Sequence, residues 1–294
     1  MKILSMDIGG SSIKYGILDE NRNIISQDKI KTPLDNLESF YQVLDSIIPK
    51  DIDGIAISMP GVIDSNNGIA LSGGALVYIV EEPIMKKLEE RYKVPVWVGN
   101  DAKCAALAEV GYGALMDVDD AVVIILGTAI GGCIVKDKKV HYGKRFSSGE
   151  VSSIIISNEY PVKEENSWYA INGIQGLLRM VQKYLETDSY YTGEEIFDMA
   201  EQGNQKVLKA LDEFCFNIAI QLFNIQTIFD PEKIAVGGGI SVQPLLIQKI
   251  NEQYKKLCAL NNPIYPISIV PCKFRNNANL LGAYYQLCKK INDI

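Results

Sequence analysis

Short apolar runs rich in β-branched residues recur along the chain, and polar turns that contain glycine separate them. Such runs are typical of buried strands. Longer segments between them place apolar residues three and four positions apart, which predicts amphipathic helices. The alternation of the two patterns indicates an α/β fold, in which helices cover the faces of a sheet.

The same pattern predicts individual elements. In the first part of the chain we expect strands at 3–6, 15–18, 24–26, 53–58 and 94–98, and helices at 37–48, 83–92 and 103–112. In the second part we expect strands at 121–126, 133–136, 140, 233–236 and 267–271, and helices at 171–187, 193–202, 205–229, 244–260 and from 280 onward.

Both parts begin with a strand, a glycine-rich turn and a second strand, which indicates a duplicated α/β unit rather than a short-period repeat. The acidic segment 117–120 lies between the two parts. We therefore expect an N-terminal α/β domain of residues 1–118 and a C-terminal α/β domain of residues 119–294. Whether the last helix packs back on the first domain stays open.

Glycine-rich turns follow three of the expected strands. They contain Asp7-Ile8-Gly9-Gly10-Ser11-Ser12-Ile13-Lys14, then Gly127-Thr128-Ala129-Ile130-Gly131-Gly132, then Gly237-Gly238-Gly239-Ile240-Ser241. Glycine lets the backbone turn sharply and approach a ligand closely. Backbone N–H groups, a hydroxyl and a lysine at such a turn suit phosphate oxygens, and an acid suits the outer shell of Mg²⁺. One such turn is usually structural, but three in one chain predict nucleotide binding.

Asn100 and Asp101 follow an expected strand and open an expected helix. Asn and Asp are favoured helix N-caps, so the pair has a purely structural interpretation. A carboxylate at the carboxyl end of a strand is also where α/β proteins bind ligands, and an attacking alcohol needs an acceptor for its proton. Both interpretations can hold together.

Composition narrows the function classes. The chain has 294 residues, 47% of them hydrophobic, and this length and composition suit two domains with a large core. Its net charge is −7. Lys and Arg are scattered, which argues against a nucleic-acid surface. No apolar stretch approaches the ~20 residues of a membrane span, and because a strand begins at once after the N-terminus we expect no signal peptide.

The six cysteines are dispersed, and none lies within four residues of another. This spacing excludes a Cys-x-x-Cys pair and favours buried, reduced thiols in a cytoplasmic protein. His141 is the one histidine, so a zinc site built on several histidines is excluded.

The three glycine turns, with Asn100-Asp101-Ala102 between the first two, resemble the ROK sugar kinases of the actin-like and hexokinase-like ATPase superfamily. The resemblance covers nearly the whole chain and includes Pro60-Gly61 and Gly149-Glu150. It implies an α/β fold of two domains, built from duplicated ribonuclease H-like units, with an interdomain cleft.

The resemblance also implies ATP-dependent phosphoryl transfer to a sugar hydroxyl, usually the 6-hydroxyl, with Asp101 as general base. The implied sugar-binding residues are Asn100, Asp101, Glu150, Gly74 and Ser153. The implied ATP-binding residues are Asp7, Gly9, Gly10, Ser11, Ser12, Lys14, Thr128, Gly131, Gly132, Gly238 and Gly239. Asp7 would reach Mg²⁺ through water.

One segment departs from the family pattern. Members commonly carry Gly-Glu-x-Gly-His, whose histidine contacts the sugar and binds zinc, but this chain has Ser153 at the histidine position. The cysteines of the family zinc site are absent too, and 161–166 stands in their place. We therefore expect no zinc site. Trp168, which follows, could stack on a sugar ring or pack in the core.

The zinc-free β-glucoside kinases of the family lack the same histidine, and this chain resembles them in 72–75, 143–146, 169–172 and 192–197. A small Ser153 leaves room for an aglycone. The expected substrate is thus a β-glucoside such as cellobiose, with N-acetylmannosamine and glucose as alternatives.

A regulator of another class, a sugar-sensing ROK repressor, is the competing hypothesis. Such repressors carry a winged helix before the sugar-binding body. We expect no such module here, because the sequence starts at the first phosphate turn, and the acidity of the chain disfavours DNA. Related kinases are commonly dimers, so a homodimer is expected, with no nucleic-acid or membrane partner.

Overall fold

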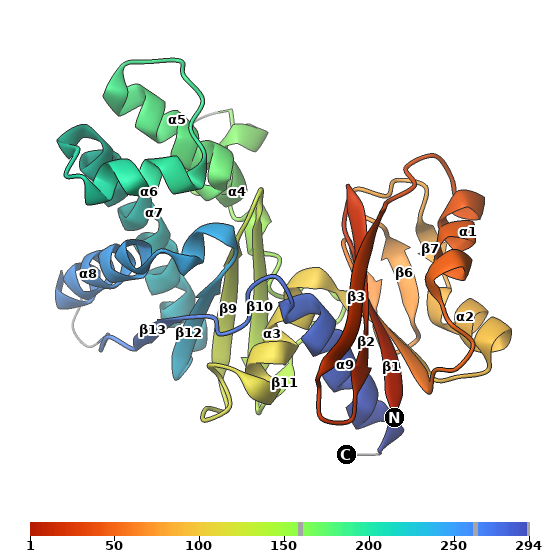
Figure 1. The fold of residues 1–294 in the computed structure, drawn as a ribbon. Coiled ribbons are helices and arrows are strands. Elements are labelled where there is room, and N and C mark those ends of the chain that lie inside the picture. The colour runs from red at the N-terminus through yellow and green to blue at the C-terminus, as the bar shows by residue number, and fades with distance from the viewer. Residues whose placement is uncertain (158–160, 261–263, 293–294) are drawn as a thin grey trace. The chain divides into compact units, whose positions relative to one another are not determined.

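The computed structural model describes residues 1–157, 161–260 and 264–292. The chain forms two compact units (Figure 1). The first comprises Met1–Gly113, Tyr142–Ser148 and the C-terminal residues from Asn276, and the second comprises Ala114–His141 and Gly149–Arg275. The acidic segment 117–120 lies just inside the second unit, where Lys233 pairs with Asp117 and Lys136 pairs with Asp120.

A five-stranded sheet in the order β3-β2-β1-β4-β8 forms the centre of the first unit. β1, β2 and β3 are antiparallel neighbours, whereas β4 and β8 run parallel to β1. The strands are β1 (Lys2–Ile8), β2 (Ser12–Asp19), β3 (Ile24–Lys31), β4 (Gly54–Met59) and β8 (Val96–Asn100). β3 is longer than the expected strand at 24–26 because its polar second half pairs with β2 as an exposed edge.

Helices cover both faces of this sheet. Leu4, Met6 and Ile8 of β1 belong to the core that also holds buried residues of α1 (Leu37–Ile47) and α2 (Ile84–Tyr92). The alternate residues point to the other face, where Ser5 donates a hydrogen bond to the carbonyl of Leu280 at 2.7 Å. That carbonyl belongs to α9 (Ala278–Ile291), which packs beside α3 (Asp101–Tyr112).

Three short strands that the sequence pattern did not predict form a separate sheet in the first unit. They are β5 (Ile63–Asp64), β6 (Ile69–Ser72) and β7 (Val80–Glu82), in the order β5-β6-β7. Strands of two to four residues are too short to show a period of two, so their pairing is decided by tertiary contacts.

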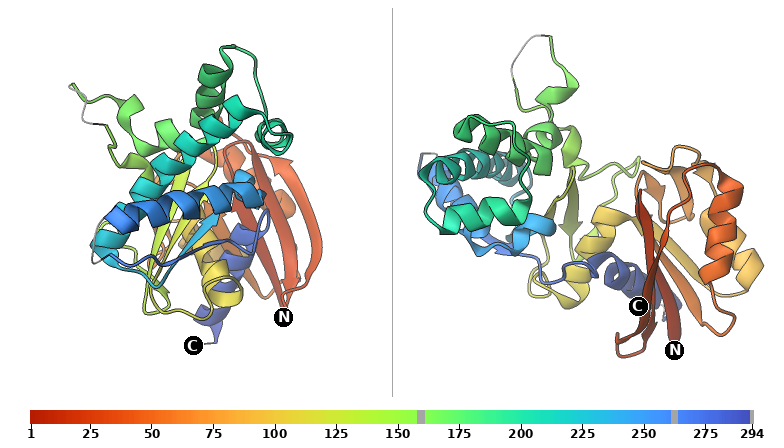
Figure 2. Two further views of the ribbon diagram at one scale, coloured as in Figure 1. Left: turned by 90° about the vertical axis from the view of Figure 1, so that its left-hand side faces the viewer. Right: turned by 45° about the horizontal axis from the view of Figure 1, so that its top comes forward.

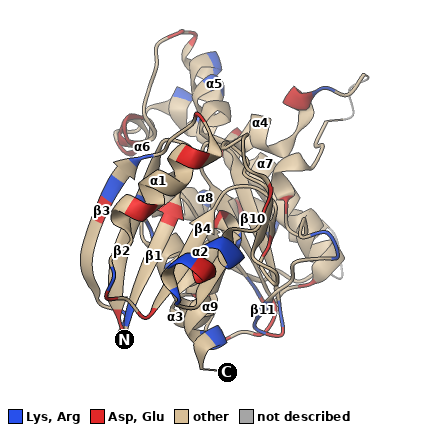
Figure 3. Cartoon of the chain, turned by 90° about the vertical axis from the view of Figure 1, so that its right-hand side faces the viewer, with Lys and Arg blue, Asp and Glu red and all other residues tan. Residues whose placement is uncertain are grey.

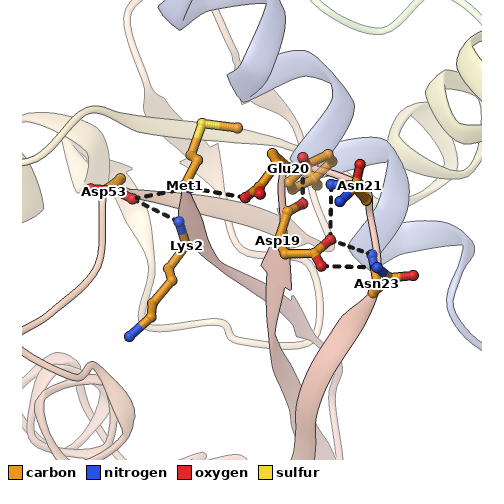
Figure 4. A network of polar contacts seen from close by, with 8 residues as sticks. Met1, Lys2, Asp19, Glu20, Asn21, Asn23 and Asp53 are labelled. Atoms are coloured by element: carbon orange, nitrogen blue, oxygen red, sulfur yellow. Dashed lines mark hydrogen bonds and ion pairs between the residues drawn. The ribbon is translucent and has the colours of Figure 1, made fainter.

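Polar contacts fix the start of β1 and the β2–β3 turn (Figure 4). The N-terminal ammonium donates to Glu20 at 3.0 Å, and the backbone N–H of Lys2 donates to Asp53 at 2.7 Å. The carboxylate of Asp19 accepts bonds from the backbone N–H groups of Asn21 and Asn23 and from the Asn23 amide. These bonds close the hairpin without glycine at its tip.

The second unit repeats the strand plan of the first. Its sheet has the order β11-β10-β9-β12-β13, with three antiparallel strands followed by two that run parallel to β9. The strands are β9 (Ala121–Leu126), β10 (Ile130–Lys136), β11 (Lys139–Val140), β12 (Lys233–Gly237) and β13 (Ser268–Pro271). Equal order and direction in both sheets are the structural counterpart of the repeated strand–turn–strand pattern.

Helices of the second unit pack around a core that includes Trp168, which is fully buried. They are α4 (Trp168–Asn172), α5 (Ile174–Leu185), α6 (Gly193–Glu201), α7 (Gln205–Phe229) and α8 (Pro244–Leu260), seen from two sides in Figure 2. The burial of Trp168 decides for core packing over an exposed stacking surface.

The single helix expected at 171–187 is wrong, because the chain breaks at Gly173 into α4 and α5. Gly173 is extended and caps α5, and a Cβ on it would meet the carbonyl oxygen of Thr128 at 2.5 Å. The next residue, Ile174, donates its N–H to the carbonyl of Gly127 at 3.1 Å. Contact with the second glycine turn therefore interrupts the helix.

The charged residues of α2 are of both signs, and the cysteines of the described ranges form no disulfides. On α2, lysine and arginine are interspersed with glutamate (Figure 3). No disulfide joins the six cysteines, all of which lie in the described ranges, and four of them are buried.

None of the described helices is both long and apolar enough to cross a membrane.

Candidate active site

Polar residues gather where β1, β4 and β8 of the first unit end. The strand register sets Asp7 beside Ser58 and Met59 beside Asn100. Because these strands are parallel, their carboxyl ends lie at one edge of the sheet, where α/β proteins place their ligands. Asp7, Asn100 and Asp101 therefore share this edge.

The first glycine turn lies at the same edge and is held by hydrogen bonds to Ser12 and from Thr32, the residue that follows β3. The N–H of Gly9 donates to the carbonyl of Ser12 at 2.9 Å, and the Thr32 hydroxyl donates to the carbonyl of Gly9 at 2.6 Å. A Cβ on Gly10 would lie 3.0 Å from the Cβ of Ala75. The turn is thus packed against the 73–75 loop, and Ser11 at its tip is exposed.

Two glycines bring the next loops together. Gly61 has a φ of +99°, and a Cβ there would meet the carbonyl oxygen of Ser72 at 2.1 Å. Gly74 has a φ of +58°, and a Cβ on it would lie 3.1 Å from the backbone nitrogen of Gly61. Left-handed backbone and close approach both favour glycine at these positions, so the Pro60-Gly61 and Gly74 loops form one surface.

Asn100 fastens that surface to α3. Its side-chain oxygen accepts a hydrogen bond from the N–H of Lys103 at 3.2 Å, as a helix N-cap does. Its amide donates to the carbonyl of Gly61 at 3.0 Å. Asp101 is the first residue of α3, is partly buried, and accepts a bond from the N–H of Ala102 at 2.8 Å. The structural interpretation of the pair is therefore correct and leaves the functional one open.

Asp7 is the carboxylate at the end of β1. Its Oδ1 accepts bonds from the Asn279 amide at 2.9 Å and from the Ser58 hydroxyl at 3.2 Å. Burial raises the pKa of Asp7, while Asn279, the charge of Lys14 and Ser58 oppose that rise. Lys14, which lies opposite Asp7 on β2, donates to the carbonyl of Asn276 at 2.7 Å.

The second glycine turn, in the second unit, connects β9 and β10. The N–H of Gly127 donates to the carbonyl of Ala129 at 2.9 Å, which leaves Thr128 exposed at the tip. Gly131 and Gly132 lie within β10. A Cβ on Gly132 would meet the carbonyl oxygen of Gly149 at 2.4 Å, so glycine is needed for the 149–153 segment to cross the strand.

The third glycine turn packs against the end of β9, directly before the second glycine turn. Gly238 has a φ of +98°, and a Cβ there would meet the carbonyl oxygen of Leu126 at 2.1 Å. A pocket of about 450 Å³ opens at this point, within the range of small-molecule sites. Apolar and polar groups share its lining, which consists of Leu126, Gly127, Thr128, Ile174, Thr192, Gly193, Glu194, Gly239, Ile240, Val242 and Gln243.

Glu150 and Ser153 are both exposed at the short 3₁₀ turn that follows Gly149. The Ser152 hydroxyl bonds the carbonyl of Ile130 and anchors this turn to β10. Within the described ranges, no three or more His, Cys, Asp or Glu side chains form a group that could hold a metal ion. Absence of zinc stays a prediction.

The structure adds residues that the sequence did not single out. Ser58 and Asn279 bond Asp7, yet each is an ordinary polar residue in its local pattern. Thr192 lines the pocket and forms a capping box with Glu195 at the start of α6. The spacing Thr-x-x-Glu was a usable signal for that helix start, though not for a pocket.

The ROK family model matches residues 3–290. The chain belongs to the ROK family. A β-glucoside kinase of Listeria monocytogenes is 30% identical to this ROK chain over 298 aligned residues, covering 99% of each protein.

Two solved structures agree with the fold. A ROK family protein from Streptococcus pneumoniae in complex with sucrose has a TM-score of 0.88 and 28% identity, covering all of both chains. A putative N-acetylmannosamine kinase from Listeria monocytogenes has the same TM-score and identity, covering 99% of this chain and 100% of that one. The ROK chain is a carbohydrate kinase with the hexokinase-like two-domain fold.

Proposed function

We propose that this ROK kinase transfers the γ-phosphate of ATP to the 6-hydroxyl of a β-glucoside such as cellobiose. The observation that carries the proposal is the Asn100–Asp101 pair, fixed at the carboxyl edge of the first sheet by the bonds of Asn100 to Lys103 and Gly61. A carboxylate held in this way can orient a sugar hydroxyl and accept its proton during transfer.

The nucleotide is proposed to use all three glycine turns. The pocket beside Gly238 and Gly239 has the volume and mixed lining that a nucleoside needs. The exposed turns at Ser11 and Thr128 offer backbone N–H groups and hydroxyls for phosphate oxygens. Ser11 belongs to the first unit, and Thr128, Gly238 and Gly239 belong to the second.

Mg²⁺ is the metal that suits the donors at the carboxyl edge of the first sheet. Mg²⁺ in kinases is usually held by one or two carboxylates together with substrate phosphates and water. Asp7 supplies one carboxylate, whose Oδ1 takes the bonds from Asn279 and Ser58, so Oδ2 can face a further partner. When bound, the metal would neutralise phosphate charge, while Asp7 would hold it through water.

The acceptor is proposed from the segment around Glu150 and Ser153. Both side chains are exposed, so Glu150 can accept a bond from a sugar hydroxyl and the short Ser153 leaves space beside it. The identity to a β-glucoside kinase over nearly the full length supports the same acceptor. N-acetylmannosamine and glucose are the alternatives within the class.

A substrate panel tests this proposal. Purified protein is incubated with ATP, Mg²⁺ and one of cellobiose, salicin, glucose, N-acetylmannosamine or sucrose, and ADP release is followed with product mass. We expect the highest kcat/KM for cellobiose or salicin, with the phosphate on carbon 6 of the non-reducing glucose by NMR.

Two outcomes contradict the proposal at different levels. Turnover of glucose or N-acetylmannosamine without turnover of either glucoside would refute the acceptor and keep the kinase. No sugar-dependent ADP release with any member of the panel would refute the proposed acceptor class altogether.

A homodimer and a cytoplasmic location are further proposals, supported by the resemblance to other ROK kinases. Light scattering behind a size-exclusion column tests the first, since a dimer has twice the chain mass.

A further inference from the structure

Asp7 and Lys14 carry opposite charges on facing positions of one hairpin. They are directly opposite in the β1–β2 register, and opposite residues of an antiparallel pair project from the same face. Side chains of opposite charge at such facing positions favour a direct ion pair. Among the described residues, however, the structure gives no ion pair between them, and each bonds a different group.

Both partners come from the segment that begins α9. The Asn279 amide donates to Oδ1 of Asp7 at 2.9 Å, and the carbonyl of Asn276 accepts from the ammonium of Lys14 at 2.7 Å. Asn276 is also where the chain enters the first unit from the second. A segment 272 residues away from Asp7 in sequence thus holds the two charges apart.

Two further hydrogen bonds fix the 276–280 segment on the sheet. The Gln27 amide on β3 donates to the side-chain oxygen of Asn277 at 3.0 Å, and Ser5 on β1 donates to the carbonyl of Leu280 at 2.7 Å. The segment is therefore tied to all three antiparallel strands. Its contact with Asp7 is one of four bonds from residues 276–280 to this sheet.

We propose that Asn279 is a positioning residue that orients the Asp7 carboxylate toward nucleotide-bound Mg²⁺ and keeps it out of an ion pair with Lys14. The proposal rests on the proposed function, because it assumes that Asp7 serves the metal and Lys14 the phosphates. A neutral amide suits this role, because it donates one bond to Asp7 and leaves the carboxylate charge uncompensated. With the Ser58 hydroxyl on the same oxygen, Oδ2 keeps a fixed direction.

Loss of the Asn279 side chain is expected to affect Mg²⁺ binding specifically. A positioning residue behind a ligand typically changes metal affinity or activity by about 10- to 100-fold. Loss of the Asn279 bond should therefore weaken the Mg²⁺-dependent part of nucleotide binding, while binding of the sugar, which does not use Asp7, stays unchanged.

The test compares Asn279→Asp and Asn279→Leu with Asn277→Leu. The first two replace the donor by a repelling carboxylate or an apolar group of similar size. The third is a matched control two residues away, since Asn277 bonds Gln27 and not Asp7. Calorimetry measures ADP affinity with and without Mg²⁺, and kinetics measure kcat and the Mg²⁺ concentration for half-maximal rate.

For both Asn279 variants we expect the gain in ADP affinity due to Mg²⁺ to fall about tenfold, and the half-maximal Mg²⁺ concentration to rise about tenfold. The KM for sugar and the affinity for metal-free ADP should stay within about twofold. Asn277→Leu should behave as the wild type, because the bonds of Asn276, Asn279 and Leu280 to the sheet remain and continue to hold the segment. Circular dichroism and the midpoint of thermal unfolding show that each variant is folded, and Asn279→Ser serves as a milder change if either fails.

Unchanged Mg²⁺ dependence in the Asn279 variants overturns the proposal. The same loss in Asn277→Leu also overturns it, because the effect would then belong to packing of the segment. Because ADP binding needs no sugar turnover, this result stays readable if no sugar proves to be a substrate, so failure of the proposed function is seen separately.

Discussion

At the residue scale, the candidate site depends on side chains that serve the fold and remain available for chemistry. Asn100 caps α3 with its oxygen and holds Gly61 with its amide, so its oxygen and its amide are both engaged. Asp101, next to it, begins the helix and stays partly exposed. A rigid neighbour and a reachable carboxylate are what a proton acceptor requires.

Replacing Asp101 by Asn should therefore separate binding from turnover. The amide keeps the size of the side chain but cannot accept the hydroxyl proton, so kcat should fall about 100-fold or more. The KM for sugar should change by less than about fivefold, because the ground-state contacts largely remain. Initial-rate kinetics check both values, and near-normal kcat would show that Asp101 is not the base.

Adjacent glycines in the third turn should differ sharply in tolerance. Gly238 combines a φ of +98° with a Cβ position 2.1 Å from a carbonyl oxygen, so Gly238→Ala should cost about 2 kcal/mol or more and weaken ATP binding. A Cβ on Gly239 meets no atom within 4 Å, so Gly239→Ala should stay within about 0.5 kcal/mol. Urea unfolding measures both, and equal losses would argue against this geometry.

At the element scale, the backbones of α3 and α9 approach each other closely at one glycine. A Cβ on Gly282 of α9 would lie 1.7 Å from the carbonyl oxygen of Cys104 on α3. The two helices are therefore in contact through backbone, which places the start of α9 beside Asp7.

Gly282→Ala tests this contact. Alanine would gain about 1 kcal/mol in helix propensity, but the clash is with backbone and cannot be relieved by a side-chain rotation. Overpacking should dominate and give a net loss of about 2 kcal/mol or more. Gly111→Ala is the control on α3, since its Cβ would meet the side-chain ring of Tyr285 at 2.7 Å rather than backbone, and a side chain can shift at lower cost. Similar stability of the two variants would contradict the expectation.

The β2–β3 hairpin should respond to acid. Bonds from Asn23 and Asn21 hold the pKa of Asp19 below its usual value. A lowered folded pKa means that the carboxylate stabilises the fold above its unfolded pKa of about 4, and that this stabilisation is lost as pH falls through the folded pKa. Asp19→Ala should therefore lower Tm at about pH 7, and the difference from wild type should shrink toward about pH 3. A difference independent of pH would contradict this.

At the scale of the whole molecule, one strand order occurs twice, and each copy carries its own set of proposed ligand-binding residues. The first unit presents Asp7, Asn100 and Asp101, and the second presents Thr128 and the pocket at Gly238 and Gly239. Each unit keeps the glycine turn after its first strand, where parallel neighbours leave their carboxyl ends.

Metal content is a prediction for the complete protein. Protein purified without added metals should contain far less than one zinc per chain, because Ser153 stands where the family has its histidine. Activity removed by a chelator should return fully with Mg²⁺ alone. Mass spectrometry of the metals checks the first statement, and about one zinc per chain would refute it.

The amino-acid sequence alone determined the α/β class, most elements and the three glycine turns, because these follow from the spacing of apolar residues and from glycine over a few neighbours. It also predicted an N-cap at Asn100-Asp101, and Asn100 forms this cap with the N–H of Lys103, three positions away. It was wrong at Gly173, where contact with Thr128 and Gly127 overrides the helical pattern.

Contacts between distant residues, in contrast, depend on tertiary packing. Asn279 reaches Asp7 across 272 residues, Gly10 packs on Ala75, and Gly282 lies against Cys104. Local preference cannot specify such contacts, because they arise when strand register and helix packing bring separate segments to one place. No local sequence pattern therefore marks the residues that hold the candidate site in position. The residues proposed to face its ligands lie in motifs that the sequence does reveal.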